Sequence, residues 1–74
     1  MAKKAKVFVD SSVFFTAVNS PTGGSAKVFS LTSRFNLFVS LVVLAEVERN
    51  VRNKLTDQAL ERFFMLTKKT KILR

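Results

Sequence analysis

VFVDSSVFF, residues 7–15, is the stretch that decides the fold. Its first three residues are apolar without interruption, which is typical of a short strand buried on both faces. The polar residues at 10–12, one Asp and two Ser, are favoured at helix N-caps, so a helix is expected to open here and run over residues 13–18. The stretch therefore predicts a buried strand that leads directly into a helix.

A loop, a second helix and a second strand are predicted next. NSPTGGS, residues 19–25, holds the only proline and both glycines and is the clearest loop in the chain. Ser25 is the predicted N-cap of a second helix, in which Ala26 and Phe29 share a face. FNLFV, residues 35–39, places apolar side chains at every second position and predicts a second strand.

The last part of the chain has helical periodicity. An apolar stripe with steps of three and four predicts a helix from residue 41; its members are Leu41, Leu44, Val47, Val51 and Leu55. Thr56 is the predicted N-cap of a further helix, with Asp57 in its first turn. The stripe of that helix is Leu60, Phe63, Phe64 and Thr67. Ile72 and Leu73 can begin a third strand.

The order of these elements favours the α/β class, because strands separated by helices form parallel sheets with right-handed crossovers. A chain of 74 residues forms one small domain, and 47% hydrophobic residues with eight Phe are more than a disordered segment carries. The sequence has neither Cys nor His. Any metal ion must therefore be held by oxygen ligands, which points to magnesium, manganese or calcium.

The charge balance is strongly basic. Thirteen Lys and Arg against five Asp and Glu give a net charge of +8, which favours binding to nucleic acid or to an acidic membrane surface. The longest apolar stretch, residues 37–45, is too short to span a bilayer. Asp10 interrupts the apolar run after the basic N-terminus, so this region is not typical of a signal peptide. We expect a cytoplasmic protein with no membrane segment.

Asp10 and Glu46 are the candidate site residues. Open α/β sheets bind ligands outside the carboxyl ends of their strands, and Asp10 directly follows the first predicted strand. Glu46 lies early in the helix after the second strand, one position off its apolar stripe, and is predicted to face the same edge. Two carboxylates are the minimum for a hard cation such as Mg²⁺. From the residues alone, a plain N-cap role for Asp10 and a solvated Glu46 remain open.

Two segments, VFVDSSVFFTAVNSPTGGSAKVFSL and FNLFVSLVVLAEVERNVRNKL, together resemble the first half of a PIN domain. The PIN superfamily includes the VapC-type toxin ribonucleases of toxin–antitoxin pairs. The resemblance implies a three-layer α/β fold with a short parallel sheet flanked by helices. It also implies that Asp10 and Glu46 belong to an acidic site for Mg²⁺ or Mn²⁺, with RNA as substrate and an antitoxin protein as partner.

The sequence departs from the family pattern in two places. Ser12 stands where the family often has Asn, and the remaining family acids come from a later strand and loop. Asp57 and Glu61 come too early to replace them. We therefore expect residues 1–74 to form an incomplete PIN-like domain that is inactive alone; the alternative is a non-catalytic nucleic-acid-binding or assembly module. The small sheet and the many Phe side chains predict a homodimer or higher oligomer.

Overall fold

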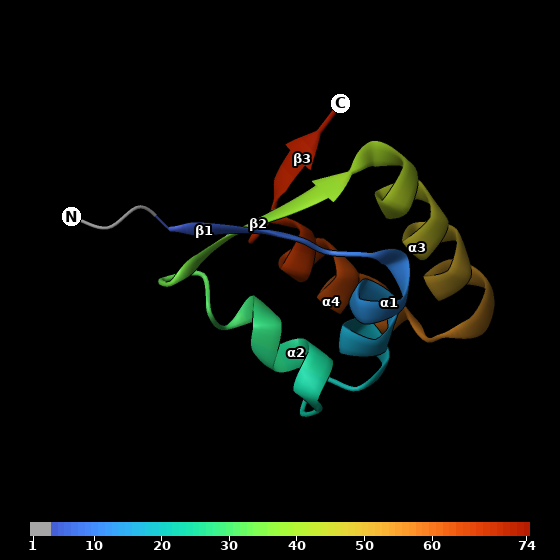
Figure 1. Cartoon of the computed structure of the whole chain (residues 1–74). Coiled ribbons are helices and arrows are strands. Elements are labelled where there is room, and N and C mark those ends of the chain that lie inside the picture. The colour runs from blue at the N-terminus through green and yellow to red at the C-terminus, as the bar shows by residue number, and fades with distance from the viewer. Residues whose placement is uncertain (1–3) are drawn as a thin grey trace.

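The structure is a computed structural model that describes residues 4–74. A pair of helices separates each strand from the next along the chain (Figure 1). In order they are β1 (Ala5–Phe8), α1 (Ser11–Asn19), α2 (Gly24–Phe29), β2 (Phe35–Ser40), α3 (Leu41–Lys54), α4 (Asp57–Thr67) and β3 (Lys71–Leu73). Of the helices in this part of the chain, none is long and apolar enough to cross a membrane.

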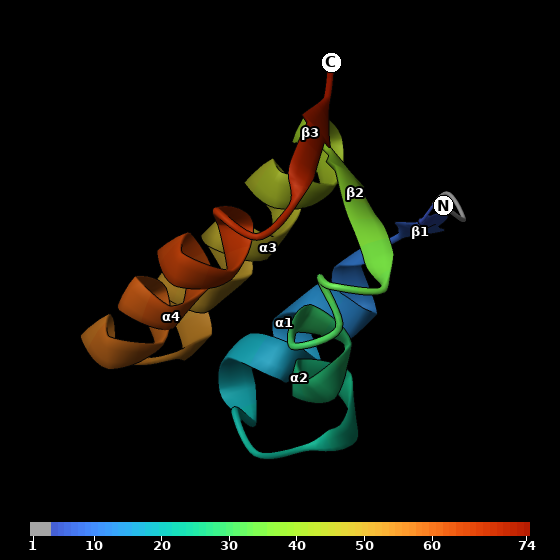
Figure 2. The same ribbon diagram turned by 90° about the vertical axis from the view of Figure 1, so that its left-hand side faces the viewer.

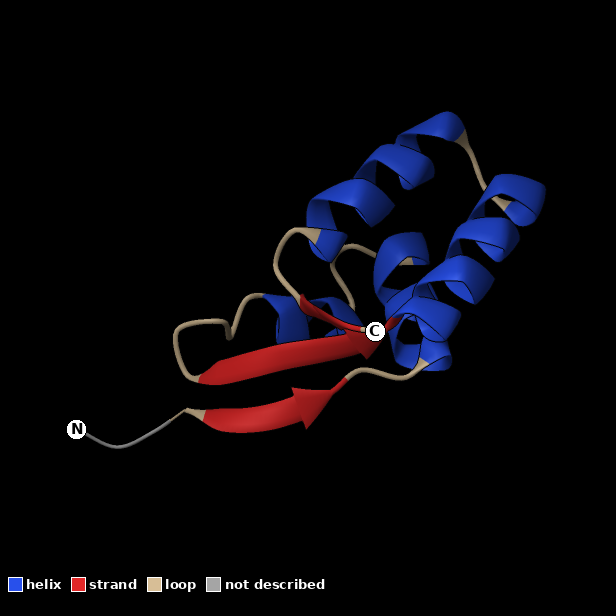
Figure 3. Ribbon diagram, turned by 90° about the horizontal axis from the view of Figure 1, so that it is seen from above, coloured by secondary structure: helices blue, strands red, loops and turns tan. Residues whose placement is uncertain are grey.

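The three strands form one parallel sheet in the order β1-β2-β3. Val7 pairs with Leu37 on the central strand β2, and Val39 pairs with Ile72 on β3. The helices gather against this sheet around α1, which packs on α2, α3 and α4 (Figures 2 and 3). The predicted α/β class and the short parallel sheet flanked by helices are confirmed.

The prediction for the first strand is wrong in its bounds and its burial. The strand covers Ala5–Phe8, and of the predicted residues 7–9 only Val9, just beyond the strand, is buried. Phe8 is 67% exposed. Successive side chains of a strand point to opposite faces of the sheet, and the face that carries Phe8 has no covering element among residues 4–74. An unbroken apolar run thus does not require burial on both faces.

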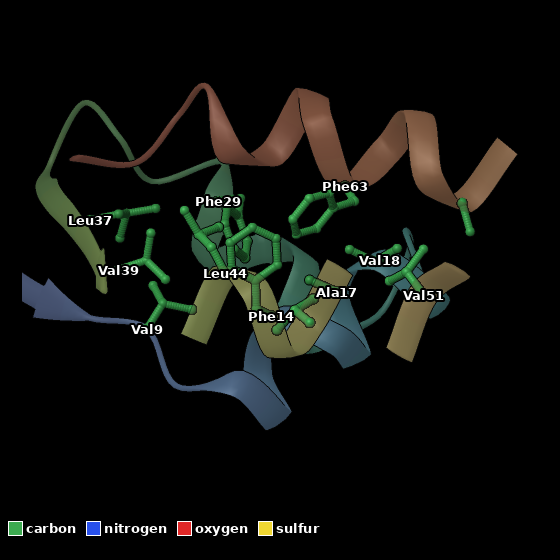
Figure 4. Packing of buried hydrophobic residues seen from close by; sticks show 12 residues of the cluster. Val9, Phe14, Ala17, Val18, Phe29, Leu37, Val39, Leu44, Val51 and Phe63 are labelled. Atoms are coloured by element: carbon green, nitrogen blue, oxygen red, sulfur yellow. The ribbon is translucent and has the colours of Figure 1, made fainter. Parts of the chain in front are cut away.

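An aromatic cluster forms the centre of the core (Figure 4). The ring centroid of Phe14 lies 5.0 Å from that of Phe29 and 5.4 Å from that of Phe63, so one side chain of α1 joins α2 to α4. Such aromatic pairs add to the gain from area burial. The remaining buried residues come from the sheet and the helices: Val9, Ala17, Val18, Leu37, Val39, Leu44, Val47, Val51 and Ala59.

Hydroxyl and carboxylate caps begin three of the helices. Asp10 caps α1, Ser40 caps α3 through Val43 N, and Thr56 caps α4 as predicted. The prediction that Ser25 caps the second helix is wrong. Gly23 is the N-cap of α2, because its N–H donates to Ser20 O (3.0 Å) and closes the preceding turn two residues before Ser25.

The apolar stripes of α3 and α4 are confirmed only at their centres. Val47 and Val51 are fully buried, whereas Leu41 is 48% exposed because it is the first residue after the cap, at the rim of the core. Phe63 is buried against Phe14, but its neighbour Phe64 is 44% exposed. One turn of α4 therefore presents one Phe to the core and the next to solvent, since adjacent helix residues point about 100° apart.

Candidate functional site

Asp10 lies at the carboxyl end of the sheet. The N–H of Val9 donates to Phe38 O (2.8 Å), so the pairing of β1 with β2 extends to the residue just before Asp10. The Asp10 side chain is exposed, and its Oδ1 accepts from Val13 N (2.8 Å) and from the Ser12 hydroxyl (2.9 Å). The N-cap role that the residue pattern left open is therefore real.

The same hydrogen bonds set the ionisation of Asp10. The Val13 N–H, followed by the Ser12 hydroxyl, lowers the pKa of Asp10 below its ordinary value of 3.8, because both bonds favour the charged carboxylate. The N-terminus of α1 also favours a negative charge at this position. Asp10 is an anion at neutral pH. Its Oδ1 accepts both hydrogen bonds, which leaves Oδ2 for a further ligand.

Glu46 lies on α3, the helix that packs beside α1. Its side chain is exposed and borders a hollow whose other side is the first turn of α1. The hollow is lined by Ser11, Ser12, Phe15, Glu46, Asn50 and Lys54. Glu46 therefore faces the residues that directly follow Asp10.

A second hollow lies at the carboxyl ends of the strands, and Asp10 borders this one. Its lining comes from the ends of all three strands and the first turn of α3: Phe8, Val9, Asp10, Phe38, Val39, Ser40, Val43 and Leu73. Asp10 and Glu46 therefore line different hollows, and Ser11 and Ser12, which directly follow Asp10, line the hollow of Glu46. This end of the sheet is where ligands of α/β proteins bind.

The carboxylates near the end of the sheet can be compared with what a divalent cation requires of its ligands. Within residues 4–74 no three Asp, Glu, His or Cys side chains lie together as a metal-holding group. Glu48 forms a surface ion pair with Arg52 (2.9 Å), and Asp57 lies in the first turn of α4. Two carboxylates are the minimum donor set for a hard cation that keeps several of its waters, as Mg²⁺ usually does.

Sequence reasoning missed the residues that share the hollow with Glu46. Asn50 and Lys54 follow Glu46 at steps of four on α3, so they lie along the same side of that helix. This spacing of four residues is visible in the sequence and could have identified Asn50 and Lys54 as neighbours of Glu46. Comparison with known proteins gave no significant match: no family model, no curated protein and no solved structure matches this chain.

Proposed function

We propose that this chain belongs to a metal-dependent endoribonuclease of the PIN type that acts in the cytoplasm. In this proposal Asp10 and Glu46 hold Mg²⁺ or Mn²⁺. The observation that carries it is the position of the two acids: Asp10 lies at the carboxyl end of the sheet, and Glu46 borders the hollow lined by Ser11 and Ser12. A ligand at the carboxyl end of a parallel sheet is the usual arrangement of α/β proteins.

The proposed reaction is hydrolysis of an RNA phosphodiester. A bound divalent cation would lower the pKa of its water and neutralise charge on the phosphate. The water oxygen forms a new bond to phosphorus, the bond from phosphorus to the leaving ribose oxygen breaks, and the proton of the water ends on that oxygen. Asp10 supplies a negative charge at neutral pH, and its hydrogen bonds lower its pKa further. Lys54, in the hollow that Glu46 borders, offers a positive charge to the substrate phosphate.

The basic charge and the PIN resemblance suggest the partners. A net charge of +8 favours RNA as the substrate class. The resemblance adds an antitoxin protein, since VapC-type enzymes are the toxins of toxin–antitoxin pairs. With only two acid ligands, we expect the chain alone to bind the cation weakly and to cleave RNA poorly or not at all.

The test is a cation-binding and cleavage series on the 74-residue chain. Asp10→Asn is the sharpest variant, because Asn is an equally good N-cap and only the charge is lost. Mn²⁺ binding should weaken in Asp10→Asn and in Glu46→Gln and stay unchanged in Glu61→Gln, whose carboxylate lies on α4. Strong Mn²⁺-dependent cleavage of RNA by the chain alone, abolished in Asp10→Asn, would show that two acids suffice.

A non-catalytic nucleic-acid-binding module is the second candidate. It is favoured by the small number of acids at the site and by the basic balance of the chain. Such a module needs neither carboxylate. RNA binding that is unchanged in Asp10→Asn and Glu46→Gln, together with no Mn²⁺ binding in any variant, would select this candidate.

A further inference from the structure

One face of the sheet, away from the core, combines aromatic and basic side chains. Phe8, Phe38 and Lys71 are direct neighbours across the three strands, so their side chains emerge on the same side. Lys6 lies two residues before Phe8, and Leu73 lies two residues after Lys71, which places both on this side as well. We call these five residues the open sheet face.

The contacts within the open sheet face centre on Phe38. Its ring centroid lies 5.6 Å from that of Phe8, and the two rings are tilted by 31°. The Nζ atoms of Lys6 and Lys71 each lie 5.9 Å from the centroid of the Phe38 ring, at the limit of a cation–π interaction. Two aromatic rings are therefore held beside two ammonium groups.

The open sheet face is exposed and carries one sign of charge. Phe8 is 67% and Leu73 40% exposed, and both lysines are exposed. The strand sequences AKVF, FNLFVS and KIL contain no Asp or Glu. The exposed Arg74 follows β3 directly and adds a further positive charge beside it. A ligand that matches this face carries both flat groups that stack on the Phe rings and negative charges that pair with the lysines.

Two other occupants fit less well. A second copy paired through a two-fold axis would place two positively charged faces against each other, so that Lys6 and Lys71 of the two copies repel. An apolar protein segment would cover the rings but desolvate the ammonium groups without a partner. A single nucleic-acid strand meets both requirements, because its bases stack on aromatic rings and its phosphates pair with lysines.

We propose that the open sheet face binds single-stranded nucleic acid. Bases stack on Phe8 and Phe38, and the ammonium groups of Lys6 and Lys71 contact the flanking phosphates. A duplex hides the faces of its bases, so single strands are preferred. The face adjoins the hollow that Asp10 borders, because Phe8, Phe38 and Leu73 also line that hollow. The proposed binding does not depend on a metal ion.

The test measures binding of the 74-residue chain to fluorescein-labelled oligouridylate and oligothymidylate by anisotropy, with a hairpin duplex as competitor. Phe8→Ala should weaken binding about tenfold, from the loss of one stacked base. Phe8 is on an edge strand and exposed, so this variant is expected to fold, and circular dichroism checks it. Phe38→Ala should have an equal or larger effect, and Phe8→Trp should retain binding.

Matched controls distinguish binding at the open sheet face from non-specific attraction of nucleic acid to the basic chain. Phe64→Ala removes an exposed Phe on α4 and should leave binding unchanged. Lys71→Gln should reduce the salt dependence of binding by more than Lys27→Gln, which changes an exposed lysine on α2. Binding should be the same with and without EDTA, so failure of the metal site leaves this result intact.

Three outcomes would overturn the proposal. The first is wild-type affinity in both Phe8→Ala and Phe38→Ala. The second is equal or tighter binding of the duplex, which would indicate attraction to phosphate alone. The third is self-association that is lost in Phe8→Ala while nucleic-acid binding stays unchanged, which would assign the face to a second copy of the chain.

Discussion

Asp10 combines a structural and a proposed chemical role in one carboxylate. Its Oδ1 accepts the two hydrogen bonds that begin α1, which fixes the carboxylate at the end of the sheet. A cation at this site would then use Oδ2, so the cap and the metal site do not compete for the same atom. The bonds to Val13 N and Ser12 Oγ also orient the carboxylate before any cation binds.

The lowered pKa of Asp10 predicts a specific pH dependence of stability. The folded-state pKa lies below 3.8, the value for the unfolded chain, so the contribution of Asp10 is present above pH 3.8 and is lost as the pH falls through the folded pKa. Urea melts of the wild type and Asp10→Asn should therefore differ in pH slope only in this acidic window. A difference in slope near neutral pH would contradict it.

Residue type indicates where helices begin, because Asp, Ser and Thr side chains accept hydrogen bonds from the backbone N–H groups of a first turn. Thr56 was predicted from its residue type and is confirmed, and the N-cap role that the sequence left open for Asp10 is present. The wrong cap at Ser25 came from choosing the last polar residue of a loop whose closing turn involves Gly23. Residue types alone do not reveal a backbone hydrogen bond that closes a turn in this way.

The exposed faces of the elements were not readable from sequence. Phe8 and Phe64 are as apolar as Phe14, yet they are exposed because the position of other elements decides what covers each face. The position of Glu46 opposite the first turn of α1 also depends on packing, here of α3 on α1. Its identity as a candidate came from its place after the second strand, whereas its neighbours in the hollow required the structure.

The cap of α4 provides a quantitative test at the level of one element. Thr56 Oγ1 accepts from Ala59 N (3.2 Å), and Ala59 is buried against the core. Thr56→Ala should lower the free energy of unfolding by about 1 kcal/mol, measured by urea denaturation. Thr16→Ala, at an exposed position within α1, is the control and should cause no loss. Equal stability of Thr56→Ala and the wild type would show that this cap does not stabilise α4.

The aromatic cluster joins the helices into one cooperative unit. Phe14 is fully buried and contacts both Phe29 and Phe63. Phe14→Ala should cost about 3–5 kcal/mol, which is a large part of the stability of a small domain. We expect this variant to be unfolded or nearly so at 25 °C by circular dichroism. The exposed Phe64→Ala should melt close to the wild type, and similar losses in both variants would contradict the core described above.

The whole molecule is predicted to self-associate. Phe64 and Met65 on α4 are 44% and 63% exposed, and β1 has an unpaired edge among the strands of residues 4–74. Exposed apolar patches and free strand edges both favour association. Sedimentation at several concentrations should show a homodimer or higher oligomer, weakened by Phe64→Glu. A single monomeric species with a cooperative melt at all concentrations would contradict this prediction.

The most direct test of the proposed metal site is Mn²⁺ titration of the 74-residue chain followed by amide NMR. Paramagnetic broadening should be strongest in the first turn of α1 and around Glu46 on α3. It should disappear in Asp10→Asn and Glu46→Gln but persist in Glu61→Gln. Broadening centred on Asp57 and Glu61, or a pattern unchanged in Asp10→Asn, would show that the two carboxylates do not form a cation site.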